Sequence, residues 1–240
     1  MLAKTPGIVI RNTKYGEGSL ISKIYTREFG VQSYMINGVY APKAAIKASL
    51  LQPLTLLDLV VYQNRLKEIN RIKEARIAHP LPNLHFDVVK SSVGMFVSEL
   101  LNKAIKEEEA NATMYDFIAS CIIRLDDESG SLGLWPVFIM LQLTKFLGFS
   151  PENNYEEPEN NYFDLMEGRF TSFPQKSDYA IGPPESKYFS DLIDLDMESF
   201  TSVTIPKPVR TELLQRLIIY YKLHLPDFHD IRSVEVLAGL

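Results

Sequence analysis

Residues 30–38 read GVQSYMING, and this stretch decides the fold class of the first part of the chain. Val31, Ser33 and Met35 fall on one face of an extended segment, and the residues between them fall on the other. Glycine at each end bounds the segment, as turn residues do. The period of two predicts a β-strand over residues 30–37.

Further extended segments lie on both sides of this strand. β-Branched and aromatic residues gather between turn residues and predict strands at about residues 6–13, 19–26, 53–63 and 66–77. The last segment is ambiguous, because Leu66, Ile69 and Ile72 recur every third residue and suit a helix as well as a strand. Five short strands within residues 1–80 are typical of a small closed barrel.

After the turn at residues 80–83 the apolar residues recur at spacings of three and four, which predicts packed helices. These helices are expected at about residues 86–105, 115–125, 134–149 and 209–225. Pro136 suits the first turn of the third helix, and Gly148 suits its C-terminal cap. The sequence thus predicts an α+β protein in which a mostly α-helical domain, residues 81–240, follows a β-domain, residues 1–80.

Residues 150–184 interrupt the helical pattern with many Asn, Glu and Pro residues. Two short extended segments, residues 162–165 and 169–173, flank the turn-forming pair Glu167 and Gly168. This arrangement predicts a small β-hairpin inserted between helices.

The charge is divided unevenly along the chain. The net charge is −5, but residues 1–80 hold 12 Lys and Arg against 5 Asp and Glu, a net charge of +7. The remainder carries 13 Lys and Arg against 25 Asp and Glu, a net charge of −12. Such asymmetry indicates modules with different partners, and the basic part is the candidate binder of a polyanion.

Cysteine content and hydropathy indicate the compartment. Cys121 is the single cysteine and lies among apolar residues, so we expect a buried, inert thiol and no internal disulfide. The N-terminus lacks the apolar run of a signal peptide, and no stretch approaches the length of a membrane span. These features predict a soluble, unexported protein of a reducing cytoplasm.

Motifs that would indicate an enzyme are weak. Gly16 and Gly18 are not followed by the Lys-Ser/Thr of a phosphate-binding loop, and the four histidines are scattered. Asp126, Asp127 and Glu128 form an acidic run that a metal-dependent nuclease would use, but a solvated helix end explains it better. We therefore expect neither a catalytic site nor a cofactor.

The basic part instead interleaves cations with tyrosines. Cations neutralise phosphates, and aromatic faces stack on unpaired bases. Phosphate contacts are predicted for Arg11, Lys14, Lys43, Lys47, Arg65, Lys67, Arg71 and Lys73. Tyr34 and Tyr40 are weaker candidates for stacking. Two alternatives remain open: these lysines only keep a barrel soluble, or the chain is a protein–protein adaptor that does not touch DNA.

The order of several segments carries a family resemblance. They are Thr5–Ile10 (TPGIVI), Tyr15–Ile21 (YGEGSLI), Tyr25–Gly30 (YTREFG), Asn37–Val39 with Lys43, Leu51–Leu57 (LQPLTLL), Phe146–Pro151 (FLGFSP) and Ile231–Ser233 (IRS). In this order they resemble the RecO family, which mediates recombination in bacterial DNA repair. The resemblance covers nearly the whole chain.

The resemblance implies a five-stranded oligonucleotide-binding (OB) barrel, so that the fifth segment is a strand, followed by the helical domain. It also implies binding of single- and double-stranded DNA and annealing of complementary strands without ATP. The expected partners are RecR and the single-stranded DNA-binding protein SSB, and the expected role is to load RecA recombinase onto SSB-coated DNA in a RecF-type pathway. The location implied is the bacterial cytoplasm, with association with the nucleoid during repair. Arg210, Arg216 and Arg232 are weak candidates for receiving the acidic C-terminal tail of SSB.

One segment departs from the family pattern. Many members carry a four-cysteine zinc site just after the segment that matches residues 147–151, but here residues 152–157 read ENNYEE. Without thiolates no zinc site of that kind can form. We expect packing to hold this region instead, through Tyr162, Phe163, Phe170 and Phe173.

Overall fold

The computed structural model describes residues 1–64, 66–106 and 109–237. Its contacts divide the chain into two compact units, Met1–Asp127 and Glu128–Leu240. The change from strands to helices falls near residue 80, as expected. Whether the chain folds as domains 1–80 and 81–240 stays a prediction, because contacts join the first two helices to the barrel.

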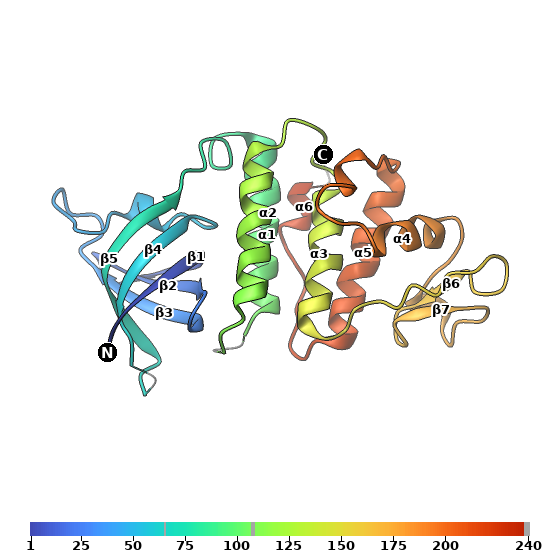
Figure 1. Ribbon diagram of the computed structural model, residues 1–240, viewed down its shortest axis with the longest axis horizontal. Coiled ribbons are helices and arrows are strands. Elements are labelled where there is room, and N and C mark those ends of the chain that lie inside the picture. Colours follow the sequence, from blue (N-terminus) through green and yellow to red (C-terminus); the bar gives the residue numbers. More distant parts are fainter. Residues whose placement is uncertain (65, 107–108, 238–240) are drawn as a thin grey trace. The chain divides into compact units, whose positions relative to one another are not determined.

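The first unit contains a closed barrel of five strands with the order β1-β2-β3-β5-β4 (Figure 1). The strands are β1 (Leu2–Tyr15), β2 (Ser19–Thr26), β3 (Gly30–Asn37), β4 (Leu56–Tyr62) and β5 (Ile69–His79). This arrangement confirms the OB-like barrel, and the ambiguous fifth segment is a strand. Apolar side chains such as Val9, Ile24 and Leu57 fill the interior.

Gly7 shows how tightly the barrel interior is packed. A Cβ atom at this position would lie 2.7 Å from Ile24 Cγ2 and 2.8 Å from Leu59 Cδ1. Real Cβ atoms do not approach other heavy atoms so closely, so any side chain here would displace core residues. The glycine therefore lets β1 pass close to its neighbours.

The barrel is closed unevenly. Strands β2 and β3 pair over their full length, whereas β3 and β5 pair in parallel over only three residues, Ser33–Met35 with Ile69–Arg71. A connector, residues 38–55, leads from β3 to β4 and contains the 3-10 helix η1 (Ala48–Leu51), which contacts β5. Ala48 and Leu50 pack on the same core as Ile72 of β5, so the connector covers the interior beside this short seam.

Two helices, α1 (Val88–Ala104) and α2 (Ala112–Asp127), lie beside the barrel in the same unit (Figure 1). The Ser98 hydroxyl donates to the Ile10 carbonyl at 2.7 Å. The Tyr25 hydroxyl donates to the carbonyl of Asn111 at 3.1 Å. These bonds place the helices on the outer side of β1 and β2.

The second unit consists of helices and a small sheet. The helices are α3 (Trp135–Leu147), α4 (Glu185–Ile193), α5 (Lys207–His224) and α6 (Val234–Leu237), with the 3-10 helices η2 (Ser177–Tyr179) and η3 (Phe200–Ser202). Pro136 lies in the first turn of α3, and Gly148 caps its end with φ of 82°. Both features confirm the sequence interpretation.

The insertion forms the predicted hairpin and one further strand. Strands β6 (Tyr162–Asp164) and β7 (Arg169–Thr171) pair in antiparallel fashion, and β8 (Ala180–Ile181) adds to the other edge of β6. Phe163 and Phe170 are buried, with ring centroids 5.0 Å apart, as the packing prediction requires. The prediction is wrong for Phe173, whose side chain is 88% exposed.

None of the helices within the described residues is both long enough and apolar enough to cross a lipid bilayer.

Candidate nucleic-acid interface

Strand β3 forms an uncharged strip on the outside of the barrel, and cations lie on both sides of it. All of its residues are described, and none carries a charge. Lys23 of β2 lies opposite Ser33 of β3, and Arg71 of β5 lies opposite Met35 of β3. Two groups of cations therefore flank the same strand.

The first group surrounds a hollow of about 820 Å³, which we call the β2–β3 hollow. Its cations are Lys23, Lys67 and Lys106, and Gln32, Ser33 and Gln63 supply polar groups. Glu28, Glu68 and Glu109 also line it, so its carboxylates equal its lysines in number. OB folds bind oligonucleotides on the face of their second and third strands and on the loop between the fourth and fifth, which here carries Lys67.

Lys23 is the central cation of this hollow. Its ammonium group donates to the Asn102 carbonyl at 3.2 Å and to Asn102 Oδ1 at 3.1 Å, which fixes its position against α1. Partial burial lowers the pKa of Lys23, and the nearby charges of Arg11 and Lys106 lower it further. Lys23, Arg11 and Lys106 thus lie close enough for the latter two to repel the first, and an approaching phosphate would relieve that repulsion.

The second group lies on the other side of β3. Arg71 and Lys73 are exposed on β5, and Lys43 and Lys47 are exposed on the connector that contacts β5. All four were predicted from sequence to contact phosphates. Arg71 lies in the short ladder between β3 and β5, and Lys47 directly precedes η1, which contacts β5. Lys73 also forms an exposed ion pair with Glu74, with 3.6 Å between the charged atoms.

The remaining predicted cations are placed differently. Arg11 lies beside Lys23, opposite it in the β1–β2 ladder. Lys14 is exposed near the far end of β1, next to the β1–β2 turn. Arg65 lies outside the described residues.

The two candidate stacking residues have different surroundings. Tyr34 is fully buried in the barrel core, where burial also raises its pKa. Its ring presents no face to solvent, so the prediction that it stacks on a base is wrong. The side chain of Tyr34 lies on the inward face of β3, because side chains alternate between the two faces of a strand. Tyr40 is 57% exposed in the connector, and its stacking role stays a prediction.

Sequence reasoning missed two cations of the β2–β3 hollow. Lys23 is an isolated lysine within an apolar strand, and only its position between Ile21 and Tyr25 on the outward face could have indicated it. Lys106 follows α1, beyond the basic part of the chain. No sequence signal joins Lys106 to the barrel, because the association depends on how α1 packs.

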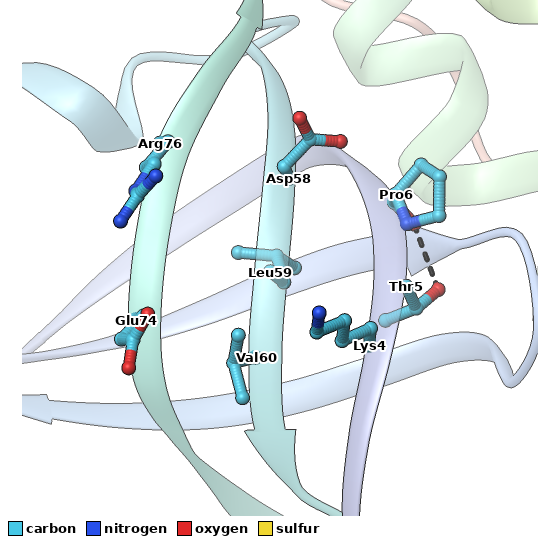
Figure 2. A pocket seen from close by; sticks show the side chains of 8 residues that line it. All are labelled: Lys4, Thr5, Pro6, Asp58, Leu59, Val60, Glu74 and Arg76. Atoms are coloured by element: carbon cyan, nitrogen blue, oxygen red, sulfur yellow. Dashed lines mark hydrogen bonds between the residues drawn. The ribbon is translucent and has the colours of Figure 1, made fainter.

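A second hollow, of about 410 Å³, lies on the face formed by β1, β4 and β5 (Figure 2). Lys4 and Arg76 supply two positive charges, and Asp58 and Glu74 supply two negative ones. Figure 2 shows them in two rows across the strands, with Val60 between Glu74 and Lys4. We call this site the neutral hollow, since its charges cancel and it offers a phosphate little net attraction.

The arginines of the second unit do not form a common cluster in the described structure. Arg216 donates from Nε to Glu212 Oε1 at 2.7 Å and from Nη1 to the Asp178 carbonyl at 2.8 Å. Arg210 lies against Gly133, and its buried Nε has no hydrogen-bond partner among the residues described. Arg232 is exposed. Reception of a tail by these residues stays a prediction.

The acidic run at the end of α2 is not solvated throughout: Asp127 is exposed, but the interpretation as a solvated helix end is wrong for Asp126, which has a structural function. Asp126 is 2% exposed, and its carboxylate accepts a bond from the backbone N–H of Asn83 at 2.9 Å and another from that of Leu84. These bonds hold the turn that precedes α1. A carboxylate used in this way is not presented to a substrate.

Comparison with known proteins identifies the family. Residues 1–81 match the domain family described as "Recombination protein O N terminal", and residues 85–230 match "Recombination protein O C terminal". A protein named "DNA repair protein RecO" from Flavobacterium psychrophilum is 35% identical, with 99% of this chain and 98% of that protein covered. Proteins of the same name from Phocaeicola vulgatus and Bacteroides fragilis are each 32% identical, with 100% of this chain and 99% of theirs covered. Matched by both domain families and by full-length relatives, the chain belongs to the RecO family of DNA repair proteins.

Proposed function

We propose that this chain is a mediator of homologous recombination in DNA repair. It binds single- and double-stranded DNA, anneals complementary strands without ATP, and assists the loading of RecA onto SSB-coated DNA together with RecR. It does so as a binding protein in the bacterial cytoplasm and not as an enzyme. The observation that carries the proposal is the uncharged strand β3 of an OB-like barrel with Lys23 on one neighbouring strand and Arg71 on the other.

Physical chemistry links this arrangement to annealing. Cations on both sides of one strip neutralise phosphates and release counterions, and this attraction is independent of base sequence. Two complementary strands held on such a surface repel each other less than they do in solution, because part of their charge is neutralised. Pairing then proceeds on base complementarity alone and needs no nucleotide hydrolysis.

The proposed protein partners concern the second unit. The acidic tail of SSB would meet a guanidinium such as Arg210, whose Nε has no hydrogen-bond partner among the described residues. Arg216 is already bonded to Glu212 and is a weaker choice. RecR is proposed as a partner on family membership.

A titration with fluorescent DNA tests the proposed binding. The full chain is added to a single-stranded oligonucleotide and to a duplex at low and moderate salt, and polarisation is measured. We expect binding to both, weakening steeply as salt rises. A protein–protein adaptor would leave the polarisation unchanged at every salt concentration.

A strand-annealing assay tests the mediator role. Two complementary oligonucleotides, one labelled, are mixed with the chain without nucleotide, in the presence and absence of SSB. We expect faster duplex formation in both conditions. Annealing that requires ATP, or an annealing rate equal to the protein-free rate, would contradict the proposal.

A further inference from the structure

A row of outward side chains crosses four neighbouring strands of the barrel. Met35 of β3 lies opposite Arg71 of β5, Arg71 lies opposite Tyr62 of β4, and Tyr62 lies opposite Leu2 of β1. Residues directly opposite in antiparallel strands have Cβ atoms about 4.5–5.5 Å apart. Tyr62 is 52% exposed and Leu2 is 50% exposed. The Tyr62 ring thus has an apolar neighbour on one side and a guanidinium on the other.

The chemistry of this row suits a nucleobase. An exposed aromatic face stacks on any base, and a guanidinium beside it can stack as well or hold the adjoining phosphate. The row also lies between two sites of different charge. On β5 it adjoins the cations that flank β3, and on β4 it adjoins Val60, two residues from Tyr62 on the same outer face.

Val60 lies in the neutral hollow, which fits the base rather than the backbone. The volume of the neutral hollow, about 410 Å³, lies within the range of about 300–1,000 Å³ that is usual for small-molecule sites. Its charges cancel, so phosphate gains little there, whereas the polar edge of a base offers both donors and acceptors to Lys4 and Glu74 (Figure 2). Cations for the phosphates lie on the other side of the row.

We propose that Tyr62, beside Arg71, stacks on an unpaired nucleobase whose polar edge faces the neutral hollow. The phosphates on either side of that base follow Arg71 and the cations flanking β3. This inference rests on the proposed DNA binding and adds a contact that only unpaired strands can make, because paired bases are stacked within the duplex.

Replacement of the ring tests the proposal in the full-length chain. We expect Tyr62→Ala to weaken binding to a single-stranded oligonucleotide about tenfold, and Tyr62→Phe to bind like the wild type because the stacking face remains. The slope of log affinity against log salt stays unchanged in Tyr62→Ala, since no phosphate contact is lost. Phe173→Ala, which removes an exposed ring from the second unit, is the matched control and leaves the affinity unchanged.

The DNA ligand supplies a second control. On an oligonucleotide of equal length made of abasic sites, and on a blunt duplex, Tyr62→Ala and the wild type should bind equally. A 2-aminopurine base in the single strand should lose fluorescence on binding wild-type protein and retain it with Tyr62→Ala. Thermal unfolding of each variant confirms that the fold is intact.

The outcomes separate the two proposals. A wild-type chain that binds neither single strand nor duplex overturns the proposed function, and the stacking inference with it. Normal wild-type binding combined with equal affinity of Tyr62→Ala for the base-bearing strand overturns the stacking inference alone. A loss of the same size on the abasic strand also overturns it, because the lost contact would then be to the backbone.

Discussion

Two tyrosines of the barrel, Tyr34 and Tyr62, have opposite surroundings although both lie in strands. Tyr34 belongs to the inward face of β3 and is completely buried, whereas Tyr62 belongs to the outward face of β4. Only the second can present its ring to a ligand. The residue type alone therefore does not indicate whether a ring can bind a ligand. The face of the strand on which the ring lies does indicate it.

Replacement of Tyr34 tests its assignment to the core. We expect Tyr34→Ala to lower the free energy of unfolding by about 3–5 kcal/mol, as for other buried aromatic residues. Tyr34→Phe should bind DNA as the wild type does, because the ring is buried and its hydroxyl, which has no hydrogen-bond partner within the described structure, does not reach the surface. Chemical denaturation and an oligonucleotide titration measure the two effects. Tenfold weaker DNA binding by the Phe variant would restore a role for Tyr34 in the interface.

Substitution of Gly7 tests the packing of the barrel interior. Gly7→Ala forces Ile24 and Leu59 apart, and overpacking of this kind costs about 1–3 kcal/mol of unfolding free energy. Gly18→Ala is the matched control, since its Cβ would meet no described atom within 4 Å. Urea denaturation of both variants gives the difference. Equal stability of the two would show that the interior adapts around residue 7.

Between elements, Asp126 ties the end of α2 to the turn before α1. We expect Asp126→Ala to lower the free energy of unfolding by about 2–4 kcal/mol, because buried backbone N–H groups of residues 83 and 84 lose their acceptor. Asp127→Ala, at the exposed neighbouring position, should change it by less than about 0.5 kcal/mol. Thermal or urea unfolding measures both. A larger effect at Asp127 would contradict this assignment.

Local patterns predicted most of the strands. The predicted bounds of β2 and β3 match the structure, because alternation and glycine turns are local properties. Strand β1 begins at Leu2, ahead of its predicted start, because its first residues pair with β4, which lies far along the chain. Strand β8 is two residues long and exists through its pairing with Phe163 and Asp164. Such long-range pairing leaves no local pattern.

The helices were likewise predicted where a local sequence pattern marks them. The four predicted helices correspond to α1, α2, α3 and α5, each with a local apolar stripe or capping residues. Helix α4 was not predicted, since its nine residues follow the irregular, Pro-rich insertion and carry few apolar positions. Its Phe189 packs against Phe163 of the hairpin at 4.6 Å between ring centroids, so tertiary contacts stabilise it.

For the molecule as a whole, the uneven charge predicts how DNA binding depends on salt. We expect the double variant Lys67→Gln/Arg71→Gln to lower the slope of log affinity against log salt by about 1.4–1.8, at about 0.7–0.9 for each phosphate contact removed. Arg169→Gln/Lys176→Gln removes the same charge from the second unit and should leave the slope unchanged. Equal slopes for all three proteins would exclude Lys67 and Arg71 from the interface.

The whole interface could be predicted only in part. A charge count needs no structure, so the sequence alone predicted phosphate contacts in the basic segment, residues 1–80, and at the cations of β5 and the connector. These contacts stay predictions. The sequence could not show that Lys106 lies beside the barrel or that Tyr34 is buried, because both depend on packing between distant segments. The places of the two hollows on the barrel surface likewise appear only when the strands are in register.

The parallel ladder between β3 and β5 has one more consequence. It has three residue pairs, against the full-length ladder between β2 and β3, and parallel pairing is slightly weaker for each residue. Local opening of the barrel therefore requires the least free energy at the β3–β5 ladder, and we expect amide hydrogen exchange to be fastest there. The seam also lies between Lys23 on β2 and Arg71 on β5. If the proposed DNA binding holds, a transient opening here would change the spacing of these cations and allow the surface to accept either a single strand or the wider duplex.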